Sequence, residues 1–190
     1  MNLEVESKFA VASPTAVRGR LEQIGARAGP QQLQVDTYYA HPARDFWRSR
    51  EAFRWRRRNQ SNVLTYKGPQ LPGPTKSRAE IELAVADGEA GARSCAALLD
   101  ALGFTPIATV RKRRVTLRLG WQGWDVEVAL DQVDGLGAFV EVEILCGEGE
   151  LGPAQEAVRS LAAAVGLEAP EPRTYLELML HHRTPPAGRP

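Results

Sequence analysis

The sequence predicts an α+β fold in which an antiparallel, eight-stranded β-barrel is surrounded by peripheral helices. About eight segments are predicted to be strands, and most of them alternate between apolar and polar residues with a period of two, which is the pattern of strands that bury one face. Segments of helical period fall between hairpins of these strands, and this order favours one antiparallel sheet. The second face of most strands carries charges. Such a sheet either stays open, with its charged face in water, or closes into a barrel.

The predicted strands begin close to the N-terminus. Residues 2–11 place Leu3, Val5 and Phe9 on one face and charged residues on the other. Residues 50–58 place Phe53 and Trp55 opposite a run of arginines, and residues 62–68 are their predicted hairpin partner. The other predicted strands are residues 31–40, 76–86, 107–119, 123–131 and 138–145.

Four helices are expected around these strands. Ser13 and Pro14 are a typical N-cap and first helical residue, and they predict a helix over residues 14–27. A second helix is expected at residues 88–102, where Gly103 ends it. Pro153 opens a third helix that runs to about residue 166, and residues 173–180 form a short final helix. We expect residues 1–183 to form a single domain and the Pro- and Gly-rich residues 184–190 to form a disordered tail.

The composition is that of a soluble globular protein. Hydrophobic residues make up 43% of the 190 residues, charged residues make up 25%, and the formal net charge is +1. This balance indicates neither a nucleic-acid partner nor a membrane surface. No apolar run has the length of a membrane span, and the charged N-terminus is unlike a signal peptide. Cys95 and Cys146 form no metal-binding pattern and are expected to be reduced thiols, so we predict a cytoplasmic protein.

The charges on the strands are segregated by sign. The first and last strands carry carboxylates two residues apart, at Glu4 and Glu6 and again at Glu141 and Glu143, whereas the middle strands carry paired bases such as Arg54 and Arg56. Carboxylates with this spacing project from one strand face and can bind Mg²⁺ or Mn²⁺, which prefer oxygen ligands. Lysines and arginines on facing strands can neutralise a polyphosphate. A barrel closed with these faces inward would therefore hold a metal and a triphosphate together.

An ordered series of motifs is similar to the CYTH superfamily, whose barrels are called triphosphate tunnels. The series begins with the E-x-E-x-K pattern of residues 4–8 and ends with the aspartate and the G-x-F-x-E-x-E pattern of residues 131–143. Between them stand residues 53–56, 64–69, 78–82 and 110–114, which resemble the family's R-x-R, T-x-K, R-x-E-x-E and K-x-R strands. Tyr175 resembles the tyrosine with which the family's series of motifs usually ends. Residues 34–38 resemble the class IV adenylate-cyclase-like branch.

The resemblance implies a metal-dependent enzyme that acts on triphosphates and has one or two Mg or Mn ions as cofactors. A class IV adenylate cyclase, which converts ATP to cyclic AMP and pyrophosphate, is favoured. A triphosphatase and a non-catalytic module that binds nucleotide or polyphosphate stay open. The implied metal ligands are Glu4, Glu6, Glu141 and Glu143, with Asp131 nearby. The implied triphosphate-binding residues are Lys8, Arg54, Arg56, Lys67, Lys112 and Arg114, and Glu80 and Glu82 would orient these bases.

The same reasoning separates other residues from the site. The parity of Arg111 and Arg113 places them off the tunnel face. Arg58, Arg78 and Arg118 fit a surface or structural role as well as a ligand role. Trp47, Trp121 and Trp124 are interpreted as packing residues, so the sequence offers no base pocket. The residue that activates the nucleophile is not identified, and a homodimer is left open.

Overall fold

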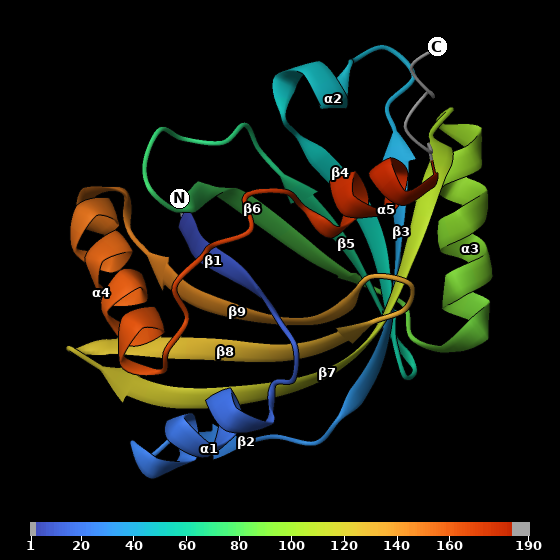
Figure 1. Cartoon of the computed structure of the whole chain (residues 1–190). Coiled ribbons are helices and arrows are strands. Elements are labelled where there is room, and N and C mark those ends of the chain that lie inside the picture. Colours follow the sequence, from blue (N-terminus) through green and yellow to red (C-terminus); the bar gives the residue numbers. More distant parts are fainter. Residues whose placement is uncertain (1–2, 184–190) are drawn as a thin grey trace, which may run out of the picture.

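The computed structural model describes residues 3–183, and the predicted tail at 184–190 lies outside them. Within this part of the chain, eight long strands form a closed antiparallel barrel and one short strand adds to it. The strands follow one another in the order β2-β7-β3-β4-β5-β6-β1-β9-β8, and a pairing between β7 and β8 closes the ring (Figure 1). The predicted barrel with peripheral helices is thereby confirmed.

The strands match the predicted segments closely. β7 is the longest, and its first half pairs with β3 while its second half pairs with β8, which is how one strand joins two parts of the ring. The extra strand β2 pairs with β7 through two residues only. The strands are β1 (Leu3–Val11), β2 (Arg27–Ala28), β3 (Gln32–Ala40), β4 (Ala52–Arg58), β5 (Ser61–Lys67), β6 (Lys76–Val85), β7 (Thr105–Trp121), β8 (Trp124–Val133) and β9 (Gly137–Cys146).

The helices differ more from the prediction. α1 stops short of the predicted end at residue 27 because Gly25 adopts a φ of 95°, which turns the chain out of the helix and into β2. α2 was not predicted; the side chain of Asp45 caps it by accepting a hydrogen bond from the backbone N–H of Arg48 at 2.9 Å. The helices are α1 (Thr15–Gln23), α2 (Phe46–Ser49), α3 (Gly88–Ala101), α4 (Leu151–Ala164) and α5 (Tyr175–Arg183), with a 3₁₀ turn at Glu148–Glu150.

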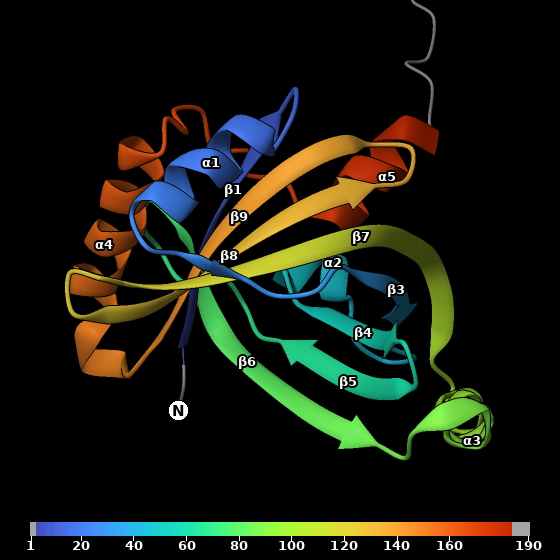
Figure 2. The same cartoon turned by 90° about the horizontal axis from the view of Figure 1, so that it is seen from below.

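Apolar side chains outside the barrel form two cores. α1 and α4 cover one side and pack on the outward residues of β1, β7, β8 and β9 (Figure 2). α3 covers β3, β4 and β5 on another side. Cys95 and Cys146 are buried thiols in these two separate cores, as expected for reduced cysteines. In the described residues, no helix has the length and apolar character needed to cross a membrane.

A third apolar cluster lies inside one end of the barrel. It joins inward residues of β3, β7, β8 and β9, among them Tyr38, Val110 and Phe139, to Tyr175 and Leu176 of α5. Figure 2 shows α5 beside the ends of β8 and β9, where this cluster lies. α5 therefore closes the barrel interior on that side and leaves the charged part of the interior open.

Candidate functional site

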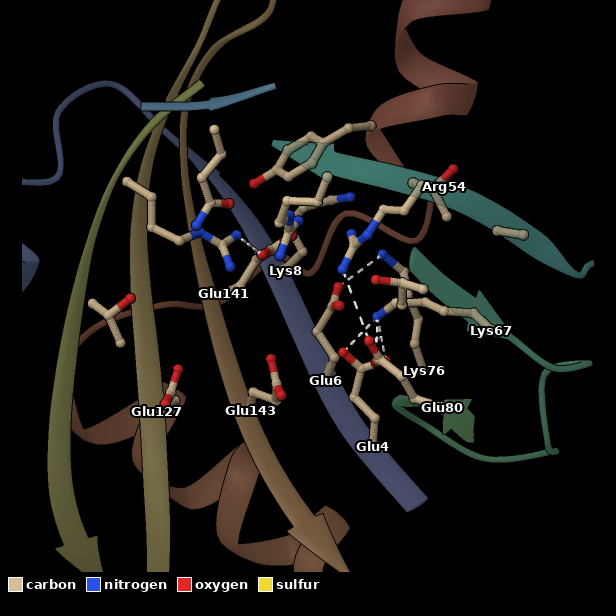
Figure 3. A pocket seen from close by; sticks show the side chains of 18 of the residues that line it. Glu4, Glu6, Lys8, Arg54, Lys67, Lys76, Glu80, Glu127, Glu141 and Glu143 are labelled. Atoms are coloured by element: carbon tan, nitrogen blue, oxygen red, sulfur yellow. Dashed lines mark hydrogen bonds and ion pairs between the residues drawn. The ribbon is translucent and has the colours of Figure 1, made fainter. Parts of the chain in front are cut away.

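The inward faces of the strands surround a cavity of about 1470 Å³, more than the roughly 300–1,000 Å³ usual for a small-molecule site. Side chains alternate along each strand, so inward positions share one parity and the charged residues of distant segments meet here. The cavity is lined by all of the predicted metal-binding and triphosphate-binding residues except Asp131 (Figure 3). Asp131 is fully buried behind the lining.

One cluster of charges is centred on Lys67. Its ammonium group lies 2.5 Å from Glu4 Oε2 and 2.8 Å from Glu80 Oε2, so two carboxylates hold one base. Arg54 approaches Glu80 at 3.8 Å and Asp36 at 3.7 Å without a hydrogen bond to either. The predicted orienting role of Glu80 is consistent with these ion pairs, whereas Glu82 accepts a hydrogen bond from Thr65 at 3.1 Å.

A second cluster is built on Asp36 of β3. Arg56 donates two hydrogen bonds of 2.7 Å to its carboxylate, which is fully buried. Burial raises the pKa of Asp36, but Arg56 and Arg54 outweigh it and hold the pKa well below its ordinary value. Asp36 was not among the predicted site residues. Its parity with Gln34 on the predicted strand could have placed it on the tunnel face.

A third cluster surrounds Asp131. Arg114 donates to both carboxylate oxygens, at 2.7 and 2.5 Å, and Lys112 donates at 3.1 Å. Arg114 also pairs with Glu141 across the cavity wall. Burial raises the pKa of Asp131, but Arg114 and Lys112 lower it below its ordinary value. Asp131 thus acts on the two bases, and its predicted role near the metal would be indirect.

Two buried cations form no close ion pair. Lys8 is only 2% exposed and Arg78 is 8% exposed, and neither forms an ion pair with any residue of the range 3–183. The Nε atom of Arg78 also lacks a hydrogen-bond acceptor. Burial, and after it the nearby Lys76, lowers the pKa of Lys8 to about 8. Such groups are costly to bury unless an anion joins them.

Three carboxylates, Glu6, Glu143 and Glu127, form a row across the adjacent strands β1, β9 and β8. Glu143 of β9 lies directly across from Glu6 of β1 and from Glu127 of β8. Figure 3 shows Glu143 and Glu127 projecting into the same part of the cavity. Glu6 contacts Lys76 at 3.4 Å, and Glu127 pairs with Arg118. Glu143 forms no ion pair within the described residues, and burial together with Glu4 raises its pKa to about 8.

The donor set of this row suits a hard divalent cation. Adjacent carboxylates of like charge repel one another, and a bound Mg²⁺ or Mn²⁺ removes that repulsion. Within residues 3–183, no three acidic, histidine or cysteine side chains already converge as a complete metal site. Mg²⁺ needs only one or two carboxylates when waters and phosphate oxygens supply the rest. The structure thus separates the predicted ligands: Glu143 forms no ion pair within the described residues, Glu6 opposite it contacts Lys76 at 3.4 Å, and Glu4 and Glu141 are held more closely by Lys67 and Arg114.

Comparison with known proteins assigns this chain to a family. The model of the family described as "CYTH domain" matches residues 2–175, which is nearly the whole chain. The chain belongs to the CYTH family. Membership confirms the predicted enzyme class, adenylate cyclase-like or triphosphatase. Enzymes with the CYTH tunnel bind triphosphate substrates and generally depend on a metal.

Similar proteins come from several organisms. The chain is 32% identical over 141 residues to "Putative adenylate cyclase MJ0240" of Methanocaldococcus jannaschii, covering 74% of this chain and 76% of that one. It is 32% identical to the PH1819 protein of Pyrococcus horikoshii, with a TM-score of 0.82 over 96% of this chain and 100% of that one. HpAC1 from Hippeastrum, described by its dominant triphosphatase activity, has the same fold at 18% identity, with a TM-score of 0.68 over 98% of each chain.

Several residues of this CYTH cavity escaped the sequence prediction. Lys76 and Arg78 are buried in the lining of the cavity. Lys76 was not among the predicted site residues, and for Arg78 the sequence left open a surface or structural role and a ligand role. Both lie at alternate positions with Glu80 on β6, and this spacing in the sequence could have placed them on the inward face. Trp47 is 59% exposed and lines the cavity, so its interpretation as a packing residue was wrong, whereas Trp121 and Trp124 pack on the outer core.

The register that excluded Arg111 and Arg113 agrees with the structure. Both side chains are exposed on the outside of β7, where Arg113 faces Asp134. Lys112, between them, is 1% exposed and points inward. Alternation along one strand therefore distinguishes cavity cations from surface cations of the same type.

The raised pKa of Glu143 predicts a pH dependence of stability in the metal-free CYTH protein. Its carboxyl faces Glu4, Glu6, Glu80, Glu127 and Lys67. Because the folded pKa of about 8 exceeds the ordinary 4.5, the stability that this proton supplies is complete below pH 4.5. It is lost as pH rises through 8, by at most about 1.4 kcal/mol per pH unit.

Glu143→Gln should therefore match the wild type in stability at pH 4.5 and exceed it at pH 9. The measurement is urea unfolding in the presence of a chelator across this range. Glu156→Gln on the exposed face of α4 is the control and should show no such divergence. Parallel pH profiles for the wild type and Glu143→Gln would contradict the assignment.

Proposed function

We propose that this protein is a metal-dependent enzyme that binds ATP through its triphosphate inside the barrel and converts it to cyclic AMP and pyrophosphate. The single observation that carries the proposal is the position of the lysines. The chain contains four, Lys8, Lys67, Lys76 and Lys112, and all of them are buried in the wall of one cavity. Three of them form ion pairs with carboxylates and Lys8 forms none among the described residues, so four ammonium groups gathered around one cavity, one of them unpaired, support a polyanionic ligand.

The bases divide into two groups with different roles. Lys67, Arg56 and Arg114 are already held by carboxylates, so their positions are set before any ligand arrives. Lys8 and Arg78 form no close ion pair among the described residues and can receive phosphate oxygens. Preorganised cations of this kind stabilise charge that develops during phosphoryl transfer, since they need no reorganisation at the moment of reaction.

We propose that Glu6 and Glu143 hold one Mg²⁺ or Mn²⁺ ion together with oxygens of the triphosphate, and that a second ion, when present, uses Glu4 or Glu141. Such an ion, when bound, neutralises charge on the phosphates and helps to align the scissile bond. The protein's own contribution is to present the two facing carboxylates of β1 and β9 in the same cavity as the lysines.

The aromatic residues of the lining favour a nucleotide over a bare polyphosphate. Trp47 is 59% exposed at the end of the cavity formed by α2, β3 and α5, where the buried rings of Tyr38, Phe46 and Tyr175 form part of the wall. A base placed at this end would leave the α-phosphate nearest to it and the terminal phosphate deeper among the charges. A cyclase needs the nucleoside held in this way, because its 3′-hydroxyl must lie in line with the α-phosphorus.

A triphosphatase is the second candidate, and the other end of the cavity favours it. That end is lined by Thr116, Arg118, Asp125 and Glu127, which are polar and partly exposed. Water can reach a terminal phosphate from there without crossing the aromatic end. Both activities use the same bases and the same metal, so they differ only in which phosphorus is attacked.

The products formed from ATP and from inorganic tripolyphosphate, with saturating Mg²⁺ or Mn²⁺, separate the candidates. We expect cyclic AMP and pyrophosphate in equal amounts from ATP and no orthophosphate from tripolyphosphate. Orthophosphate from both compounds, without a cyclic product, would replace the cyclase by a triphosphatase. Tight binding of both compounds without turnover would instead support the non-catalytic module.

A further inference from the structure

Two lysines of the cavity approach the ring of Tyr175, the first residue of α5. The ammonium group of Lys8 stands over its ring at 4.2 Å from the ring centroid, and that of Lys112 stands at 4.8 Å. The tyrosine is only 4% exposed. The face of an aromatic ring is electron-rich and attracts cations at such distances, most strongly where water is excluded.

The ring is fixed from several sides. Its hydroxyl donates a hydrogen bond of 2.9 Å to Asp131 Oδ2, the same carboxylate that accepts from Lys112 and Arg114. Phe139 meets it edge-on, with centroids 5.2 Å apart and an interplanar angle of 75°. Tyr175 therefore has little freedom to turn, and its ring is a rigid surface for the two ammonium groups.

The ring matters most for Lys8. Glu141 is the residue directly across from Lys8 on β9, but its carboxylate is engaged by Arg114. Among the described residues Lys8 has no ion pair, so the ring is the close electron-rich group beside its charge. A carboxylate in that place would have to be displaced by an incoming phosphate, whereas a ring face leaves the other side of the ammonium group free.

We infer that Tyr175 is a positioning residue for the triphosphate, because its ring holds Lys8 and Lys112 in the cavity without neutralising either of them. The identity of the ligand as a triphosphate rests on the proposed function. The contacts of the ring with Lys8 and Lys112 do not depend on it. α5 thus supplies, from a distant segment of the chain, an aromatic ring that contacts lysines of two strands far apart in the sequence, β1 and β7.

Two variants of Tyr175 separate the ring from the hydroxyl. Tyr175→Phe keeps the ring face and loses the hydrogen bond to Asp131, while Tyr175→Leu loses both. Titration calorimetry with inorganic tripolyphosphate should show roughly tenfold weaker binding for Tyr175→Leu and near wild-type binding for Tyr175→Phe. Phe139→Leu is the matched control, because it loosens the same apolar cluster without touching a lysine. It should lose stability and keep its affinity.

A second readout follows the lysines directly. In the NMR spectrum of protein labelled at the lysine side chains, ε-methylene protons near the ring face of Tyr175 should be shifted upfield. The chain has four lysines, and Lys8→Arg and Lys112→Arg assign the two signals of interest. These shifts should persist in Tyr175→Phe and vanish in Tyr175→Leu.

The outcomes distinguish a failure of the proposed function from a failure of Tyr175 to position the lysines. Shifted signals in a wild type that binds no tripolyphosphate would reject the proposed function and leave the positioning of the lysines standing. Equal weakening in Tyr175→Phe and Tyr175→Leu, or in Phe139→Leu and Tyr175→Leu, would overturn the inference and assign Tyr175 a structural role. Unshifted signals in the wild type would overturn it as well.

Discussion

Lys8→Met is expected to lower turnover with ATP by a factor on the order of 10²–10³, the usual cost of losing one preorganised donor to a developing charge. Lys8 is the suitable cation to remove because it forms no close ion pair among the described residues. Replacing Arg56 or Lys67 should slow the reaction too, but it would also strand Asp36 or Glu4 as a buried carboxylate. The fold of Lys8→Met should survive, and its stability should equal or exceed that of the wild type.

Arg113→Met and Arg111→Met are the controls for this prediction. Both arginines are exposed on the outer face of β7, a single position away from inward-facing residues of the same strand. Their loss should change turnover less than about twofold, since charges across the barrel wall are screened by solvent. Steady-state kinetics at saturating metal, with unfolding curves for every variant, makes the comparison. Similar losses in the inner and outer variants would mean that the cavity is not where triphosphate binds.

Removal of divalent metal should abolish turnover, and Mg²⁺ or Mn²⁺ should restore it. Glu143→Gln should then require at least tenfold more metal for half-maximal activity, because Glu143 presents a carboxylate that no base engages. Glu4→Ala and Glu141→Ala should also cut turnover sharply. Each of these, however, leaves Lys67 or Arg114 with one carboxylate fewer, so their effects combine metal and base.

Activity measured against metal concentration tests the assignment. Glu156→Gln on α4 is the matched control and should follow the wild-type curve. A Glu143→Gln curve that coincides with the wild type would remove Glu143 from the metal site. Full activity in excess chelator would refute metal dependence altogether.

Much of the barrel was predictable because alternation along a strand is a local property. Leu3, Val5 and Phe9 define one face of β1 whatever their neighbours are, and the charged residues between them must then share the other face. The same parity separates Lys112 from Arg111 and Arg113 without any knowledge of the fold. The order of the charged motifs was enough to suggest the family.

The partners of each charge became visible only in the tertiary structure. Glu6 meets Glu143 and Asp36 meets Arg56 through pairings between different strands, and a pairing register is set by turns and closure rather than by either strand alone. α2 was not predicted from the sequence because its four residues are too few to show a helical period and the helix depends on the cap by Asp45.

The sequence by itself determined the two faces of most strands, and hence that one face of the sheet is charged. The tertiary structure decided which of those charges are neutralised. Lys67 is paired and Lys8 is free, although both are lysines on inward positions of their strands. The difference arises because ion pairing depends on distances between segments brought together by closure of the ring, and Tyr175 reaches Lys8 only when α5 folds over the barrel end.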